Sequence, residues 1–114
     1  MQRFMLKSKI HRATVTDADL HYEGSISIDE QLMAAADFFP YEKVDIYDVS
    51  NGERFSTYVI PGPRGSGTLC LNGAAAHRCT AGDKVIITAF CLTDEPVERK
   101  VVLVDDQNHI SGYV

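Results

Sequence analysis

The 114-residue sequence has no long apolar run, no excess of positive charge and no even set of cysteines. A helix that crosses a membrane needs about 20 mostly apolar residues. No segment approaches that length, and residues 1–12 carry charges throughout, so we expect neither a membrane anchor nor a signal peptide. The sequence therefore predicts a cytoplasmic protein.

The charge balance is acidic, with a formal net charge of -5 at pH 7. Proteins that bind nucleic acids concentrate basic residues on one surface. Here the basic residues are scattered along the chain, which argues against a nucleic-acid partner. Isolated cations of this kind can still bind a small anion.

Neither the cysteines nor the histidines have the spacing of a metal site. The cysteines form no Cys-x-x-Cys pair, which predicts reduced thiols; they are Cys70, Cys79 and Cys91. The histidines also lack ligand spacing, so we expect no metal; they are His11, His21, His77 and His109. The short motifs of nucleotide-binding proteins, zinc proteases and α/β-hydrolases are missing as well.

Alternation of apolar and polar residues predicts strands over most of the chain. The predicted strands cover residues 10–16, 43–49, 54–60, 68–71, 84–91 and 100–104. In the second of these we expect Asp45 and Asp48 on the polar side of the strand. The apolar side is expected to carry Val44, Ile46 and Val49.

One hairpin turn and one helix interrupt the strands. Asn51-Gly52 predicts a type I′ turn, because both residues tolerate a positive φ. Asp29 is a good N-cap for a helix over residues 31–37, and Pro40 stops that helix. Residues 74–76 predict one more helical turn. We expect a single, mainly-β domain that spans the whole chain and closes into a barrel, because closure removes sheet edges.

The dipeptide Gly24-Ser25 permits a reaction of the backbone itself. Glycine has no Cβ, so its carbonyl is accessible and its backbone can adopt a strained turn. Attack of Ser25 Oγ on the Gly24 carbonyl would give an ester, and elimination and hydrolysis would leave a pyruvoyl group at position 25. Because Gly-Ser is also a common turn dipeptide, the two residues alone favour a plain turn.

Four stretches of the chain carry a more specific signal. They are residues 7–16 (KSKIHRATVT), 18–29 (ADLHYEGSISID), 51–60 (NGERFSTYVI) and 71–78 (LNGAAAHR). In this order and spacing they resemble the aspartate 1-decarboxylase family, over about residues 1–91. The resemblance implies a six-stranded double-psi β-barrel with one or two short helices. It also implies a homotetramer with active sites between subunits.

The same resemblance implies that the chain cuts itself between Gly24 and Ser25, into residues 1–24 and residues 25–114. Ser25 then becomes a covalent pyruvoyl cofactor, which forms a Schiff base with L-aspartate and accepts the electron pair released with CO₂. The product, β-alanine, feeds pantothenate and coenzyme A biosynthesis. No metal or pyridoxal phosphate is implied. Spontaneous cleavage and cleavage helped by a maturation factor both stay open.

Three residues match the family's positions for handling the substrate. Tyr58 is implied as the proton donor to the carbanion. Arg54, four residues earlier on the same strand face, is implied as an anchor for a carboxylate. Lys9 is implied as a second cation, although Lys7 is equally plausible from the residues alone. Which cation binds which carboxylate stays open.

Thr57 faces away from Tyr58 in a regular strand, so either the strand bulges or Thr57 serves another step. We favour a hydrogen bond from Thr57 to the Gly24 carbonyl oxygen as charge builds there; the resemblance also implicates Thr57 in substrate binding. A turn of small residues supplies backbone N–H groups and a side-chain amide; it consists of Asn72, Gly73, Ala74 and Ala75. Further candidates for processing or for the pocket wall are His11, Tyr22 and Tyr47.

Two other functions stay open at this point. One is a non-catalytic β-barrel interaction module, in which Gly24-Ser25 is only a turn and the chain stays intact. The other is a hydrolase with a free cysteine or serine nucleophile, which predicts inactivation by a thiol or serine reagent. No histidine is visibly placed as the base of such a hydrolase.

Overall fold

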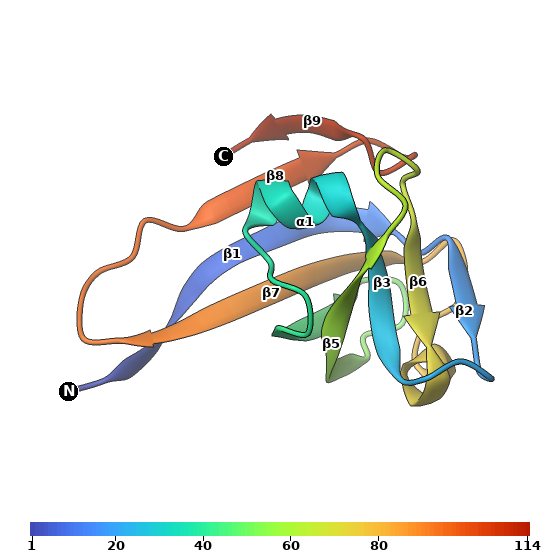
Figure 1. The fold of residues 1–114 in the computed structure, drawn as a ribbon, viewed down its shortest axis with the longest axis horizontal. Helices are drawn as coiled ribbons and strands as arrows, with labels where there is room; N and C mark the ends of the chain where they lie inside the picture. The colour runs from blue at the N-terminus through green and yellow to red at the C-terminus, as the bar shows by residue number, and fades with distance from the viewer.

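The computed structural model describes residues 1–114 as nine strands, one α-helix and one short 3-10 helix (Figure 1). The strands are β1 (Arg3–Thr14), β2 (Asp17–Asp19), β3 (Ser25–Asp29), β4 (Lys43–Asp48), β5 (Arg54–Gly62), β6 (Leu69–Asn72), β7 (Lys84–Thr93), β8 (Lys100–Val104) and β9 (Ile110–Tyr113). The helices are α1 (Glu30–Ala36) and the 3-10 helix η1 (Gly73–His77). The prediction of a mainly-β fold is confirmed.

All nine strands belong to one sheet, in the order β2-β6-β3-β5-β4-β7-β1-β8-β9. Three neighbouring pairs are parallel, namely β1 with β8, β2 with β6 and β3 with β5. The sheet has nine strands instead of the predicted six, and the predicted closure is not seen, since the order ends at β2 on one side and β9 on the other. The chain extends the sheet with short strands at both ends instead of joining them.

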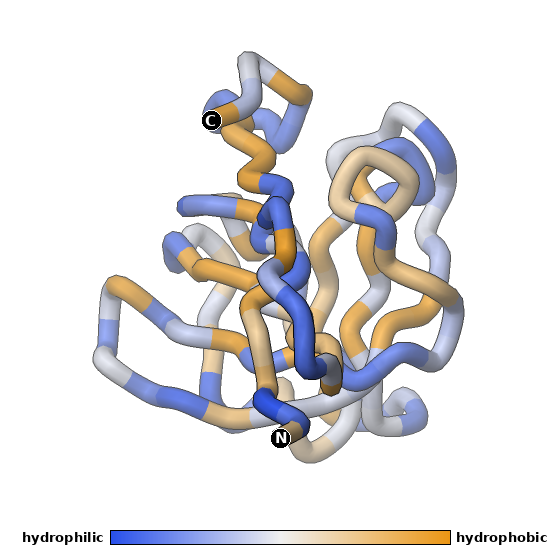
Figure 2. The backbone as a smooth tube through the Cα atoms, turned by 90° about the vertical axis from the view of Figure 1, so that its left-hand side faces the viewer, coloured by the Kyte–Doolittle hydropathy of each residue, from blue (hydrophilic) through white to orange (hydrophobic).

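The core lies on one face of the long strands. Ile10, Ile87 and Ile46 are direct neighbours on β1, β7 and β4, and all three are fully buried. They belong to a single hydrophobic cluster of 20 buried residues. Figure 2 shows hydrophobic residues recurring along the strands and hydrophilic residues in many of the connections. Alternation therefore decides which side chains face outward, including those of the candidate site.

The helix α1 begins where the sequence predicted. The Asp29 side chain accepts the Gln31 backbone N–H at 2.8 Å, which is an N-cap contact. The helix ends at Ala36, before Pro40, because Asp37 takes a left-handed conformation with φ of 57°. The Asp29 carboxylate also accepts the N–H groups of Gly65 and Gly67, both at 2.9 Å. None of the helices has the length and apolar character needed to cross a bilayer.

The hairpin between β4 and β5 differs from the predicted type I′ turn. Five residues connect the strands, and only Gly52 among them has a positive φ, of 78°. The Gly52 N–H bonds to the Asp48 carbonyl at 2.9 Å, and the Asp48 side chain accepts the N–H groups of Ser50 and Asn51. The predicted sides of Asp48 and Val49 are also wrong, because Asp48 is 2% exposed and Val49 is 44% exposed. Strict alternation from Val44 places position 48 on the core side.

Tertiary pairing extends the sheet beyond the predicted segments. β1 begins at Arg3 instead of residue 10, because it pairs with β7 from Arg3 onward. β2, β3 and β9 have too few residues for a clear alternating pattern, and neighbouring strands stabilise them. β3 is the most consequential of these, because it begins at Ser25.

Candidate active site

The Gly24–Ser25 bond lies where an exposed loop enters the sheet. β3 starts at Ser25 and runs between β6 and β5. Gly24 is exposed, whereas Ser25 is 1% exposed and lies directly opposite Asn72 in the β3–β6 ladder. The bond therefore has one side open to solvent and a serine hydroxyl held inside the fold.

The Ser25 hydroxyl has two partners. Asn72 Nδ2 donates to Ser25 Oγ at 2.9 Å and to Ser27 Oγ at 3.0 Å. Ser25 Oγ in turn lies 3.4 Å from the Glu23 carbonyl oxygen, to which it donates. These contacts fix the hydroxyl next to its own N-terminal backbone. Ser27 was not among the predicted site residues, although its position two residues after Ser25 on the same strand face was a usable signal.

Gly73 packs tightly against the loop that contains the bond. A Cβ built on Gly73 would lie 2.8 Å from both Cα and N of Gly24, and 2.9 Å from the Tyr22 carbonyl oxygen. Gly73 also has a φ of 64°, a conformation that only glycine adopts without strain. Gly24 itself has no positive φ, so the left-handed backbone conformation lies at Gly73 and the strain expected at Gly24 is not seen. Position 73 requires glycine on both counts.

A surface pocket of about 400 Å³ opens beside this bond. Five predicted site residues line it, namely Gly24, Thr57, Tyr58, Ala74 and Ala75. Phe55, Ser56 and Arg78 complete the wall and were not predicted. Arg78 lies in the stretch 71–78, but nothing in the sequence distinguishes it from an ordinary surface arginine. In the structure it pairs with Glu53 at 2.7 Å.

Thr57 and Tyr58 both reach this pocket from a regular strand. The β4–β5 ladder has no register shift, which excludes the predicted alternative of a bulge. Thr57 is half-buried and Tyr58 is 38% exposed, as alternation requires. No hydrogen bond joins Thr57 to the Gly24 carbonyl in this structure. The Tyr58 ring lies 6.3 Å from the ring of Tyr41, with an angle of 40° between the planes.

A second group of predicted residues lies on the outer face of the sheet. Arg54 pairs with Tyr47 in the β4–β5 ladder, and its guanidinium carbon lies 4.0 Å from the Tyr47 ring centroid. Lys9 is opposite Thr88, which is opposite Asp45 on β4. Lys9 and Arg54 therefore share this face, but β7 and β4 separate their strands by roughly 14 Å.

The two candidate lysines differ in their contacts. Lys7 Nζ lies 2.8 Å from the Glu42 carboxylate and 2.6 Å from the Asp37 carbonyl oxygen. Lys9 has no ion pair and no hydrogen-bond partner from its side chain. The structure thus distinguishes a lysine that is already neutralised from one whose charge is available.

His11 and Tyr22 are not brought to the pocket. His11 lines a separate pocket with Arg12 and Lys84. Burial lowers the pKa of His11, and the charges of Lys9 and Arg12 lower it further. Tyr22 contributes its carbonyl to the contact with Gly73, but its side chain is exposed.

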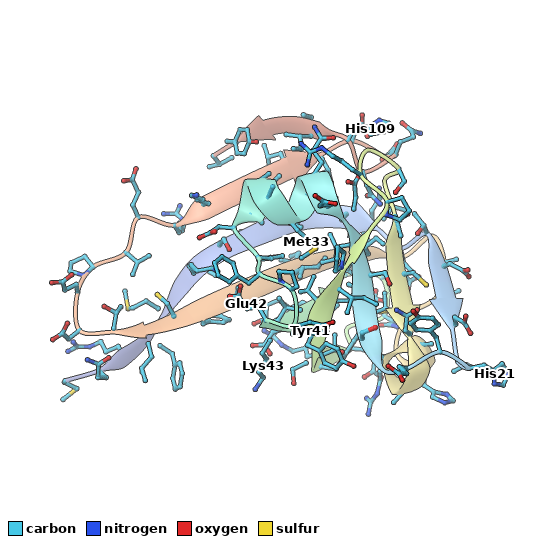
Figure 3. The ribbon with its side chains drawn as sticks, in the orientation of Figure 1. His21, Met33, Tyr41, Glu42, Lys43 and His109 are labelled. Carbon is cyan, nitrogen blue, oxygen red and sulfur yellow. The ribbon has the colours of Figure 1, made fainter.

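The remaining histidines and acidic residues form no further site. Figure 3 places His21 beyond the end of β2 and His109 at the opposite side of the structure, near β9, while Tyr41 and Lys43 lie near β5. No group of three or more His, Cys, Asp or Glu side chains lies close enough together to hold a metal ion.

Comparison with known proteins gives matches over nearly the whole chain. A family model described as aspartate decarboxylase matches residues 1–111. An aspartate 1-decarboxylase from Syntrophus aciditrophicus is 66% identical over 114 residues, which covers 96% of this chain and 98% of the relative. The corresponding protein of Syntrophobacter fumaroxidans is 59% identical, with 95% and 90% covered, and that of Thermoanaerobacter pseudethanolicus is 54% identical, with 95% and 96% covered.

These matches define a carbon–carbon lyase rather than a binding module or a hydrolase. The chain belongs to the aspartate decarboxylase family. The predicted family and the prediction of an enzyme are both confirmed.

Proposed function

We propose that this protein decarboxylates L-aspartate to β-alanine and CO₂ with a pyruvoyl group made from its own Ser25. Family membership supports the reaction. The observation that carries the proposal is the buried Ser25 hydroxyl, which Asn72 holds at 2.9 Å beside an exposed Gly24. An ordinary turn serine needs neither the burial nor the amide contact.

The residues around position 25 fit such a group. A Cβ built on Gly24 meets no atom within 4 Å, so a new carboxylate there would have room and solvent. On the other side of the bond, the Asn72 amide points at the atom that Ser25 presents. Cleavage turns this oxygen into part of the Gly24 carboxylate, to which the Asn72 amide can donate as well as to a hydroxyl. Gly73 has no side chain, so it leaves room for the backbone of Gly24.

Self-cleavage uses the chain's own atoms. Ser25 Oγ attacks the Gly24 carbonyl carbon, the C–N bond breaks, and the hydroxyl proton passes to the freed Ser25 nitrogen, which gives an ester. Elimination releases Gly24 as a carboxylate, and addition of water then releases ammonia and leaves the pyruvoyl group. We assign Thr57 to donate to the Gly24 carbonyl oxygen while negative charge builds there. Their shared pocket supports this role.

Once formed, the pyruvoyl group supplies a ketone for the substrate amine and an electron sink for loss of the carboxylate. Tyr58 holds its phenol proton in the same pocket and donates it to the substrate carbon after CO₂ leaves. The small side chains of Ala74 and Ala75 leave the backbone of η1 accessible to the substrate. Asn72 and Gly73 complete this binding turn.

We propose that Lys9 and Arg54 hold the two substrate carboxylates from a neighbouring subunit of a homotetramer. Both cations lie outside the pocket that contains Gly24 and Tyr58. The one cation that lines that pocket, Arg78, is already paired with Glu53 at 2.7 Å, so a substrate carboxylate there would need a further cation. Lys9 has no partner in its own chain. Tyr47 supports this arrangement, because its ring stacks on the Arg54 guanidinium and limits its movement. We also propose that His11 and Tyr22 line the active site at this interface between subunits.

The finer description of the fold is also a proposal. Two parallel strand pairs, β1 with β8 and β3 with β5, support a double-psi arrangement within the nine-stranded sheet. We further propose that residues 1–24 and 25–114 together form one domain after cleavage. The β-alanine produced would enter pantothenate biosynthesis in the cytoplasm.

An intact mass spectrum under denaturing conditions tests this function. We expect two chains, residues 1–24 and 25–114, with the larger blocked at its N-terminus. Borohydride together with L-aspartate should add a trapped adduct to the larger chain. A chain that stays whole after prolonged warming, and also with the family's accessory factors, would contradict the proposal and favour a plain interaction module. Ser25→Ala is the matched control, because it removes the attacking oxygen.

A further inference from the structure

Asp48, the last residue of β4, has a buried carboxylate that is only half satisfied. Its Oδ1 accepts the backbone N–H groups of Ser50 at 2.8 Å and Asn51 at 3.2 Å. Its Oδ2 is buried and receives no hydrogen bond from any donor. An ionised oxygen in that position would lose its hydration without compensation. The contacts therefore favour the neutral acid, whose Oδ2 carries a proton.

Two side chains from the segment after η1 contact this acid. Burial raises the pKa of Asp48, and a hydrogen bond with the Asp83 carboxylate raises it further. The same bond with Asp48 lowers the pKa of Asp83, as does the Thr80 N–H, which donates to Asp83 at 3.0 Å. A proton shared by the two carboxyl groups therefore favours Asp48, whose hydroxyl would donate the hydrogen bond to Asp83. Burial, and after it the neighbouring Asp48, raises the pKa of Cys79 to about 12, so its thiol stays protonated beside Asp48.

No cation neutralises this cluster. The nearby Glu53 pairs with Arg78 at 2.7 Å, in an exposed position. Lys84 directs its ammonium group to Thr14 Oγ1 at 2.7 Å and to Asp106 at 2.9 Å. Ionisation of Asp48 would therefore place a second negative charge beside Asp83 without a counter-charge.

The cluster lies where two parts of the candidate site are joined. Asn51 Nδ2 donates to the Arg78 carbonyl at 2.8 Å, and the Val49 N–H donates to the Lys84 carbonyl at 2.8 Å. These bonds hold the hairpin loop, residues 49–53, against residues 78–84. Arg54 follows the loop directly.

The same contact reaches the pocket from its other side. η1, which contributes Ala74 and Ala75 to the pocket wall, ends just before residue 78. A change at this contact would therefore move the strand that carries Arg54 relative to η1.

We propose that Asp48 is a positioning residue whose neutral form holds the hairpin loop 49–53 against residues 78–84. Ionisation makes Asp48 and Asp83 repel each other, and the contact loosens. Arg54 and η1 then lose their fixed relation. The effect on substrate binding rests on the function proposed above, whereas the loosening itself does not.

Thermal unfolding measured against pH tests the loosening. Asp48→Asn keeps an acceptor for the loop N–H groups and a donor for Asp83, but it cannot ionise. Because the folded state raises the pKa of Asp48, its contribution to stability is present at low pH and is lost as pH rises through that raised value. We expect the melting temperature of the parent to fall over that range and that of Asp48→Asn to stay level. Asp94→Asn, in an exposed loop, should follow the parent.

Hydrogen exchange locates the change. At a pH above the raised pKa of Asp48, amides of residues 49–53 and 78–84 should exchange several-fold faster in the parent than in Asp48→Asn, while α1 shows no difference. Asp83→Asn is a second variant that should reduce the loss of stability at this higher pH, because it removes the repelling charge. An equal loss in the parent and in both variants would overturn the proposal.

The Michaelis constant for L-aspartate tests the positioning role. We expect KM of the parent to rise several-fold over the pH range in which its melting temperature falls, with a smaller change in kcat. Asp48→Asn should remove that rise. A rise in KM that persists in Asp48→Asn would overturn the positioning role and leave a structural one. Release of no CO₂ by any of the proteins would instead refute the proposed function, while exchange still decides whether the contact loosens.

Discussion

Gly73 lies so close to Gly24 that a single added carbon on it would stand 2.8 Å from the Gly24 nitrogen and Cα. The two glycines come from η1 and from the loop before β3, which the β3–β6 ladder brings together. The position of the Gly24–Ser25 bond therefore depends on a residue that has no side chain of its own.

Gly73→Ala should slow self-cleavage strongly, because its Cβ must displace the backbone that carries the bond. The positive φ alone costs about 1–3 kcal/mol of stability for a residue other than glycine. Gly82→Ala is the control, because Gly82 also has a positive φ, of 96°, but has open space around it. The fraction of cleaved chain over time, measured by mass spectrometry, checks this. Equal slowing in both variants would attribute the effect to strain alone.

Lys9→Gln should raise KM for L-aspartate by about tenfold or more, equivalent to about 1.4 kcal/mol of lost binding energy. Its side chain has no partner in the chain, so melting temperature should hardly change. Lys7→Gln should instead lower the melting temperature and leave KM nearly unchanged, because Lys7 is paired with Glu42 at 2.8 Å. That pair is partly exposed and contributes up to about 1 kcal/mol. Steady-state kinetics and thermal unfolding of both variants check this, and an unchanged KM in Lys9→Gln would remove Lys9 from the site.

Tyr58→Phe should cleave normally and lose decarboxylation by about 10²–10⁴-fold, because only the second reaction needs its proton. Tyr41→Phe is matched to it, since that ring lies 6.3 Å from Tyr58 and loses the same atom. Release of CO₂ from labelled aspartate, normalised to cleaved chain, measures the effect. Comparable losses in the two variants would contradict a specific role for Tyr58.

Asp29 should make the fold sensitive to acid. Burial alone would raise its pKa, but N–H groups of Gly67, Gly65 and Gln31 outweigh burial and lower it. Its contribution to stability is therefore present above the ordinary Asp pKa and is lost as pH falls through the lowered value. Asp29→Asn should lose about 1–3 kcal/mol near neutral pH, and the difference from the parent should shrink in acid. Urea unfolding at both pH values checks this, with Asp94→Asn as control.

Features set by neighbouring residues could be predicted from the sequence. The cap at Asp29 and the shared face of Arg54 and Tyr58 depend on spacing of a few residues, and the structure agrees with both. The residues around Gly24 and Asn72 were predicted as site residues only through the resemblance to a known family. Their role in the chemistry stays a prediction.

Features set by distant residues could not be predicted in this way. The open strand order of the sheet, the start of β1 at Arg3 and the contact of Gly73 with Gly24 all depend on which strands pair. Asp48 was assigned to the polar side because aspartate is seldom buried. Its alternation with Val44 and Ile46 indicated the core, and there the pattern outweighed the residue type.

A cut after Gly24 would not divide the folded protein. β1 forms ladders with β7 on one edge and β8 on the other, and β2 pairs with β6, so every strand before the cut is bonded to strands after it. The two polypeptides would remain one particle with no covalent tether, and dilution alone should not release the smaller. Native mass spectrometry should record a single complex where denaturing conditions yield two masses.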